Sequence, residues 1–572
     1  LEDSEPEVRA HTCELLGEWG VTQVWQALVK MLKDPSPRVR LYAALALARY
    51  PRPQVAPAVF GMLAEADNHD PALRHGGVMA LAATAKPLLL WEAFQRQPEE
   101  VKHSKAVRLA LAVALRRMNS PIVARLLDDP DPDVVAEAAR AIHDVPIPQA
   151  LPALAERMSR SVIRSRDAAL RRAMNANFRL GGKEHARRLA TLAADAQAPI
   201  ELRRGALELL EAWADPDPRD WVLGMWRPLE HRSAEPARQA MASVFDRLLA
   251  PSSPVAQVAL RCAARLGVPA AAPHLEKMVR DGNVEGPQRA EALQLLVNLA
   301  PDRADHVLEA ALRDSHLEVQ AVALSHRAKR DPERAARLLQ PLLNAKQPRR
   351  LRKAFEILRA LPSEVAAPLI VAALEKLISG KVPQGSQLEL LEAAEACDDP
   401  RVRRTLERYR KSLPADDPLA PYRVALVGGD PNRGRELFRN RVDLSCQRCH
   451  TIEGVGGSVG PDLSGIGREK TPEYILESIV APNRQIAKGY DSVVVLDTDA
   501  KVHTGVLKKE ADTTLQLMTA EGELVTIPKK DIEARKAGKS AMPDDLIKLL
   551  SLRDLRDLVA FLSHQRKGKA LK

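Results

Sequence analysis

A short pattern that recurs along the first four hundred residues most constrains the fold. An Asp is followed five positions later by a Val, and then by a stretch rich in Ala and Leu. An Asp or Ser suits a helix cap, Pro suits the turn or the first helical position, and the Val begins an apolar face. Helix pairs of this length cannot bury their faces alone, so they must stack. The copies begin at Asp3, Asp34, Asp129 and Asp314, with a looser copy at Asp70.

Composition agrees with a mainly α fold. Apolar residues make up 45% of the chain, charged residues 28% and aromatic residues only 3%. The net charge of +10 is spread among interspersed acidic and basic residues, which indicates a solvated surface that favours an acidic partner. No run of eighteen apolar residues occurs, so no transmembrane segment is expected.

The recurring pattern resembles HEAT repeats, most closely the short bacterial kind with Asp-x-x-x-x-Val-Arg at the second helix. This resemblance implies a solenoid over residues 1–414 that serves as a scaffold or docking surface for a protein partner. Nucleic acid is not expected as a partner, although a basic solenoid that binds DNA would show salt-dependent retention. The Pro-rich and then Gly-rich residues 415–429 are predicted to be a linker.

The chemical signature of the second part is Cys446-Gln447-Arg448-Cys449-His450. Cys-x-x-Cys-His is the attachment motif of a c-type haem. Two thiols on one helical turn reach the two vinyl groups, and the adjacent His supplies the proximal iron ligand. A zinc half-site would need a second ligand pair, and a redox Cys-x-x-Cys would need a βαβ surround. The other cysteines, Cys13, Cys262 and Cys397, are scattered in sequence and offer no such pair.

The residues around this motif resemble a class I cytochrome c. A helix opening at Asp430 carries Gly434 and Phe438 one turn apart, the spacing at which that family packs its first helix on its last. After His450 comes a Gly-Pro-x-Leu-x-Gly loop, from Gly460 to Arg468.

By this resemblance the Pro461 carbonyl accepts a hydrogen bond from His450, Leu463 packs on the haem edge and Arg468 faces a propionate. Met542, in Met-Pro shortly before the final helix, is expected as the sixth ligand of one covalent haem c iron. Met518, His503 and His564 are the rival ligands, with His564 the candidate for bis-His ligation.

Between these cytochrome-like segments, at about residues 490–535, apolar and polar residues alternate in short runs rich in β-branched side chains. They predict an antiparallel sheet or barrel of four or five strands inserted into the second domain. The expected fold is therefore mainly α: a HEAT-like solenoid, then an all-α class I cytochrome c fold over residues 430–572 with a small β insertion.

The second part as a whole resembles the haem-binding domain of planctomycete and verrucomicrobial type, found in the C-terminal part of membrane-bound dehydrogenase-type proteins. This resemblance implies a periplasmic location, a dehydrogenase module ahead of Leu1 in a longer precursor, and a redox acceptor. No catalytic residue is apparent, so the expected function is electron transfer with the HEAT array as scaffold. The alternative is a HEAT interaction module whose haem is a sensor or a structural group.

Overall fold

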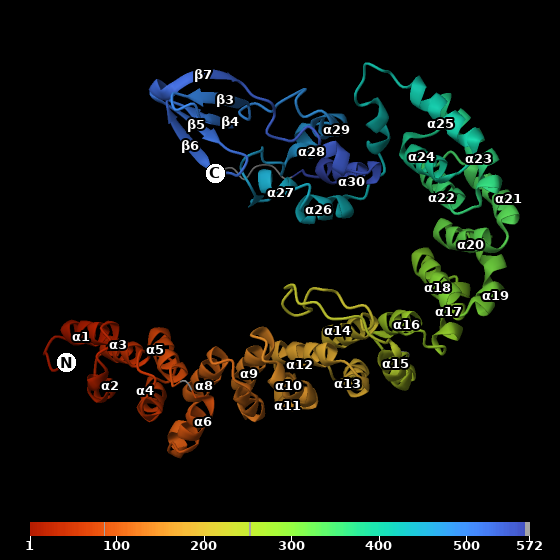
Figure 1. Cartoon of the computed structure of the whole chain (residues 1–572). Coiled ribbons are helices and arrows are strands. Elements are labelled where there is room, and N and C mark those ends of the chain that lie inside the picture. The colour runs from red at the N-terminus through yellow and green to blue at the C-terminus, as the bar shows by residue number, and fades with distance from the viewer. Residues whose placement is uncertain (85, 251–252, 567–572) are drawn as a thin grey trace. The chain divides into compact units, whose positions relative to one another are not determined.

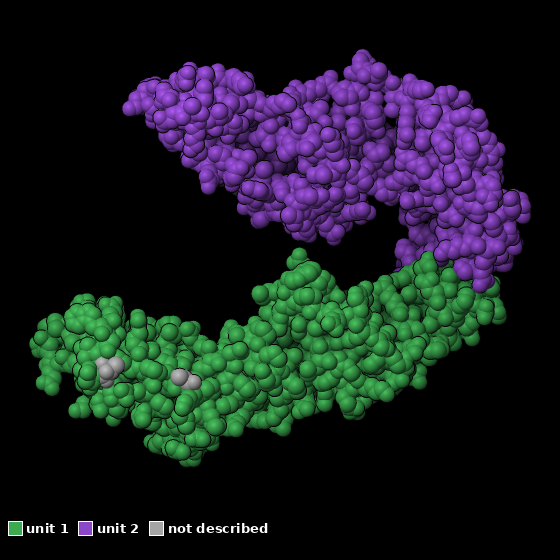
Figure 2. Space-filling model, viewed as in Figure 1, with its two compact units in different colours: residues 1–284, 291–307 green, residues 285–290, 308–572 purple. Residues whose placement is uncertain are grey.

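The computed structural model describes residues 1–84, 86–250 and 253–566, so the last six residues of the expected second domain lie outside it. The chain divides into two compact units (Figure 2). Unit 1 comprises residues 1–284 and 291–307, and unit 2 comprises residues 285–290 and 308–572. Each unit is described by itself below.

Unit 1 is a stack of short helices (Figure 1). Helices two places apart in the order pack on one another, α1 on α3, α3 on α5 and α12 on α14, as expected of a solenoid. The helices are α1 (Pro6–Glu18), α2 (Trp25–Met31), α3 (Pro37–Leu47), α4 (Ala56–Ala66), α5 (Pro71–Ala82), α6 (Pro87–Gln95), α7 (Glu99–His103), α8 (Lys105–Arg117), α9 (Pro132–Asp144), α10 (Leu151–Glu156), α11 (Ser161–Arg164), α12 (Asp167–Leu180), α13 (Lys183–Ala193), α14 (Ile200–Glu211), α15 (Glu235–Leu248), α16 (Ala256–Arg265) and α17 (Ala271–Arg280).

The Asp of the repeat does more than the sequence pattern predicts. Asp34 lies two residues before the N-cap of α3, where its carboxylate accepts the Ser36 N–H at 2.9 Å. The same carboxylate accepts two hydrogen bonds from Arg9 of the preceding repeat, at 2.8 and 2.9 Å. Arg108 pairs with Asp129 in the same way at 2.8 Å. The repeat Asp therefore joins successive helix pairs as well as ordering its own turn.

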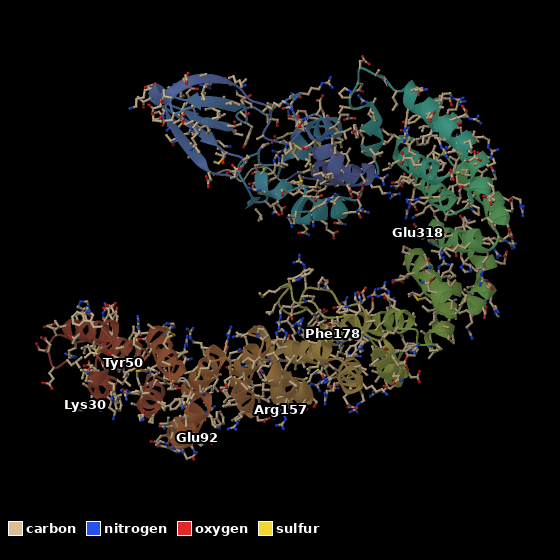
Figure 3. The ribbon with its side chains drawn as sticks, in the orientation of Figure 1. Lys30, Tyr50, Glu92, Arg157, Phe178 and Glu318 are labelled. Atoms are coloured by element: carbon tan, nitrogen blue, oxygen red, sulfur yellow. The ribbon has the colours of Figure 1, made fainter. Side chains whose placement is uncertain are left out.

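Buried aromatic side chains fill the gaps between repeats in unit 1. Figure 3 labels two residues that take part in such contacts, Tyr50 and Phe178. Tyr50 is buried and its hydroxyl donates to the Leu16 carbonyl oxygen at 2.5 Å. Phe178 meets the fully buried Trp213 edge to face, with ring centroids 5.9 Å apart. Trp213 therefore packs inside the helical stack of unit 1.

Unit 2 begins with the end of the helical stack. Helices α18 (Gly286–Leu299) and α19 (Pro301–Ala311) contribute to both units. The remaining stacked helices are α20 (Leu317–Arg330), α21 (Pro332–Leu343), α22 (Pro348–Leu358), α23 (Ser363–Ile378), α24 (Gln387–Ala396) and α25 (Pro400–Ser412). The chain then forms the 3-10 helix η7 (Ala420–Ala425), which packs against the last helix of the chain.

The C-terminal part of unit 2 combines helices with a five-stranded sheet. Its helices are α26 (Pro431–Asn440), α27 (Cys446–Cys449), α28 (Ile466–Glu469), α29 (Pro472–Val480) and α30 (Leu552–Ser563), with 3-10 turns η8 (Lys529–Asp531) and η9 (Leu546–Leu549). Its strands are β1 (Thr451–Ile452), β2 (Val455–Gly456), β3 (Ser492–Asp497), β4 (Val502–Glu510), β5 (Thr514–Met518), β6 (Leu524–Pro528) and β7 (Ile532–Ala537).

The β insertion is curled into a partly closed barrel. Its strand order is β6-β5-β4-β3-β7, with every neighbour antiparallel. The two edge strands, β6 and β7, are joined only by the three residues of η8. In a flat sheet these edges would lie about 19 Å apart, further than so short a connection can reach. The sheet must therefore curl, and it does so around a core of Val493, Val495, Leu515, Leu517 and Ile527.

Candidate functional site

Two helices distant in sequence form the base of the C-terminal domain. Asp430 caps α26 by accepting the Asn432 N–H at 2.9 Å, and Pro431 occupies the first turn. Gly434 faces α30 so closely that a Cβ there would lie 2.0 Å from the Asp557 carbonyl oxygen. Phe438 packs on Phe561 with ring centroids 5.6 Å apart. The contact expected from the Gly434 and Phe438 spacing is thus present.

The Cys-x-x-Cys pair lies on α27, a single turn that begins after Ser445 in the left-handed region at φ 50°. Neither Cys446 nor Cys449 is in a disulfide, and both are half-buried. Burial raises the pKa of Cys446 to about 11 and also raises the pKa of Cys449. Both side chains are therefore thiols at neutral pH, on the same side of one helical turn.

His450 leaves the helix in an extended conformation, and its ring is fixed by the following loop. Its Nδ1 lies 3.0 Å from the Pro461 carbonyl oxygen. Because a carbonyl can only accept, Nδ1 carries the proton and Nε2 keeps its lone pair. Burial lowers the pKa of His450, although the bond to Pro461 opposes the shift. The imidazole is therefore a neutral base with one free nitrogen, the form in which His binds a metal.

The loop after His450 can approach the motif only because it is rich in glycine. A Cβ at Gly457 would lie 1.8 Å from the Arg448 carbonyl oxygen, and one at Gly460 would lie 2.6 Å from His450 Cε1. No side chain fits at such distances, so these two positions require glycine. The loop thereby brings Pro461 within hydrogen-bonding reach of the imidazole.

A cavity of about 290 Å³ connects these elements. This volume is close to the lower end of the usual range for small-molecule sites, about 300–1,000 Å³. Most of the other lining side chains are apolar, and those from helices include Phe438 of α26, Ile475 of α29 and Leu558 of α30. The cavity is lined by six of the residues predicted for the site: Cys446, Cys449, His450, Pro461, Leu463 and Met542.

One predicted site residue lies elsewhere. Arg468 is exposed on α28 and is not among the residues that line the cavity. Lys470 lines it instead, with its ammonium 4.3 Å from the Tyr474 ring centroid. A one-turn helix presents successive residues to different sides, which sequence spacing alone could not resolve.

The rival ligands also lie outside this cavity. Met518 ends β5 in the barrel, and His503 pairs with Asp497 at 2.7 Å. His564 is exposed just after α30, where its Nδ1 lies 2.7 Å from the Ala560 carbonyl oxygen. None of the three is among the lining residues, so Met542 is the methionine that the described chain brings to the same cavity as His450.

The sequence did not predict that the barrel would form part of the site. Val506 of β4 and Tyr490, just before β3, both line the cavity. The Lys508 ammonium donates to the Ser458 carbonyl oxygen at 2.9 Å and lies 4.5 Å from the Tyr490 ring centroid. A Gly-Tyr pair at 489–490 was the one sequence signal at this wall.

The donor set fits a covalent c-type haem. Two thiols on one turn, an imidazole with a free Nε2 and a thioether line one mainly apolar cavity. Across residues 1–84, 86–250 and 253–566, this cavity included, no group of three or more His, Cys, Asp or Glu side chains is placed to hold a metal ion.

A membrane span is not evident among the helices of these residues. No single described helix is long and apolar enough to cross a bilayer, and only the bent pair Pro71–Ala82 and Pro87–Gln95, at 117°, reaches the required length and composition together.

Comparison with known proteins bears on the solenoid. The HEAT-repeat family matches residues 1–82 and, in an overlapping match, residues 26–106. No curated protein sequence matches the chain. The region of residues 1–106 is therefore built of HEAT repeats.

Several solved helical-repeat structures are similar at low identity. A Kap121p carrying several substitutions has a TM-score of 0.43 and 14% identity, over 78% of this chain and 55% of that one. Kap121p bound to Pho4p has a TM-score of 0.41 and 13% identity, over 75% of this chain and 52% of that one. Importin beta has a TM-score of 0.34 and 13% identity, over 78% of this chain and 73% of that one. The chain spans about half the length of the Kap121p structures that it matches.

Proposed function

We propose that the C-terminal domain transfers electrons through one covalently bound c-type haem, and that the HEAT repeats hold it against protein partners. The scaffold role has the more direct support, because the HEAT family match covers the first repeats, residues 1–106. The haem role rests on one observation: Cys446, Cys449, His450 and Met542 line a single apolar cavity.

Each residue has a distinct role in this proposal. Cys446 and Cys449 form the two thioether anchors, and the free Nε2 of His450 is the proximal ligand. Pro461 orients that ring through its carbonyl oxygen. The Met542 sulfur is the distal ligand, and a thioether there favours the reduced iron. When bound, the haem supplies a one-electron couple between ferric and ferrous iron.

The apolar wall has a functional consequence. Side chains from α26, α29, α30 and the barrel contribute to the mainly apolar lining of the cavity, and an apolar surround raises a redox potential by disfavouring the more charged state. If haem were bound, His450 and Met542 would hold its iron from this chain, which would suit electron transfer and leave no open position for a substrate. The partners proposed are therefore an electron-donating dehydrogenase module and an electron acceptor, both outside the cytoplasmic membrane where haem c is attached.

The experiment that tests this proposal is a visible spectrum of the full chain made in a periplasm with haem c maturation. A low-spin c-type spectrum with the far-red ferric band of sulfur ligation is expected in the folded protein, and the haem should stay attached to the chain after denaturation. Met542→Leu should abolish that band, while the matched variant Met518→Leu in the barrel should keep it. Replacing both Cys446 and Cys449 with Ser should leave no covalent haem. Absence of haem from the wild-type chain would refute the proposal.

The alternative is a HEAT interaction module with a sensory or structural haem. The HEAT match supports the module itself. This alternative requires a weak distal bond, so ferrous wild-type protein would bind carbon monoxide readily. Slow or absent binding would favour electron transfer.

A further inference from the structure

The segment that leads to Met542 is tied to the start of the barrel. Strand β7 ends at Ala537, and the next residue, Gly538, donates its N–H to the Ser492 carbonyl oxygen at 2.8 Å. Ser492 is only 5% exposed, and its hydroxyl donates in turn to the Lys539 carbonyl oxygen. A Cβ at position 538 would lie 2.2 Å from Ser492 Oγ, so a larger residue there would force the Ser492 hydroxyl away from its present position.

A second attachment comes from the residues after α29. The Ser540 N–H donates to Asn483 Oδ1 at 2.8 Å, across 57 positions of sequence. Ser540 Oγ then accepts the Met542 N–H at 3.2 Å. The three residues Gly538, Lys539 and Ser540, shortly before Met542, are thus held by β3 on one side and by Asn483, after α29, on the other.

These bonds matter because the segment has no helix or strand of its own, although the Met542 side chain packs against the core of the domain. No helix or strand is assigned between Ala537 and η9, and Ala541 and Pro543 on either side of Met542 are exposed. A loop held by few contacts opens easily, and each lost hydrogen bond shifts its equilibrium. The position of the Met542 sulfur in the cavity therefore depends on these two attachments.

We propose that Asn483, Ser492 and Ser540 are positioning residues that hold Met542 in the cavity, and that the β insertion serves the site through this hold. The inference rests on the proposed haem ligation and adds to it the residues that keep the distal ligand bound. It also gives the barrel a role in ligation, because its first strand and the exit from its last strand meet at the segment that carries Met542.

The test uses the haem-loaded full chain with Asn483→Ala and Ser492→Ala. Loss of one such hydrogen bond should raise the fraction of protein with the sulfur displaced by roughly 2- to 10-fold. Carbon monoxide binding to ferrous protein should become faster by a similar factor, and the far-red ferric band should weaken. Hydrogen exchange at the Ser540 amide should speed up in Asn483→Ala by a comparable factor.

Two further variants separate positioning from general loosening of the fold. Asn483→Asp keeps an acceptor oxygen and should restore slow carbon monoxide binding. Thr526→Ala removes an exposed barrel hydrogen bond, from Gln516 Nε2 at 3.3 Å, away from the segment. This control should leave the far-red band and the exchange at Ser540 unchanged.

The outcomes distinguish this inference from the proposed function. If no haem attaches to the wild-type chain, the proposed function fails and the inference fails with it. If haem attaches with Met542 bound, but Asn483→Ala and Ser492→Ala match Thr526→Ala in spectrum and carbon monoxide binding, only the inference is overturned. Faster binding in both variants, with rescue by Asn483→Asp, supports it.

Discussion

A buried ion pair joins the last helix of the chain to the end of the helical stack. Arg556 of α30 donates to Glu389 of α24 at 2.8 Å, and the two side chains are 5% and 1% exposed. Within the described residues, neither Arg556 Nε nor Glu389 Oε2 has a hydrogen-bond partner. The pair is therefore shielded from water but incompletely satisfied.

The stability lost on breaking this ion pair can be estimated from its distance and burial. At 2.8 Å and an effective dielectric constant of about 20, the attraction is about 6 kcal/mol. Desolvation costs several kcal/mol for each ion, so the pair as a whole contributes little. Removing Glu389 leaves the buried Arg556 without its hydrogen-bonded carboxylate. Glu389→Ala should therefore destabilise unit 2 by about 3–5 kcal/mol, while replacing both residues with Leu should be neutral or stabilising by up to about 4 kcal/mol.

The chain offers a matched control. Arg403 and Asp398 pair at 2.9 Å, almost the same distance, but their side chains are 64% and 90% exposed. Asp398→Ala should cost less than about 1 kcal/mol. The comparison isolates burial, because the two pairs have nearly equal separations.

The assay is hydrogen exchange by mass spectrometry on peptides from α24 and α30 over a urea series. All six tryptophans lie in unit 1, so tryptophan fluorescence reports that unit and should not change. The reasoning fails if Glu389→Ala and Asp398→Ala cost the same, or if the double Leu variant is as unstable as Glu389→Ala.

Three further predictions concern the site. Gly434→Ala should destabilise unit 2 by about 1–3 kcal/mol in urea unfolding, because its Cβ would lie 2.0 Å from the Asp557 carbonyl oxygen. Gly460→Ala should displace the His450 ring, 2.6 Å from the new Cβ, and the low-spin spectrum should be lost although the thioether bonds still form. In haem-free chain, the raised pKa of Cys446, about 11, should make its alkylation by iodoacetamide slow at pH 7 and about tenfold faster for each pH unit until pH approaches 11. A plateau near pH 9 would contradict this burial.

Features encoded within a few residues could be predicted from the sequence. The repeat pattern gave the stacked helices, and Val39, Val134 and Val319 are fully buried as the pattern predicts. Val8, in the first copy, is 47% exposed and so departs from the pattern. The one-turn spacing of Gly434 and Phe438 likewise gave their contact with α30.

Features that depend on distant residues could not be predicted. Glu389 and Arg556 are 167 positions apart, and neither belongs to a motif. The role of the repeat Asp in joining neighbouring repeats depends on an Arg some twenty-five positions earlier, as with Arg9 and Asp34. The curl of the sheet follows from the pairing of β3 with β7, which alternating residues do not specify.

Because the two ends of the barrel lie close together, the barrel behaves as a separable insertion in the C-terminal domain. Ser492 opens β3 and bonds to Gly538 and Lys539 just after β7, so the barrel enters and leaves the domain at one point. Segments with adjoining ends can be grafted into a host fold without separating the elements around them. The exposed turn at 498–501 lies at the opposite end of β3 from Ser492, so it can accept a longer loop or an inserted reporter while the helices on either side of the barrel keep their places.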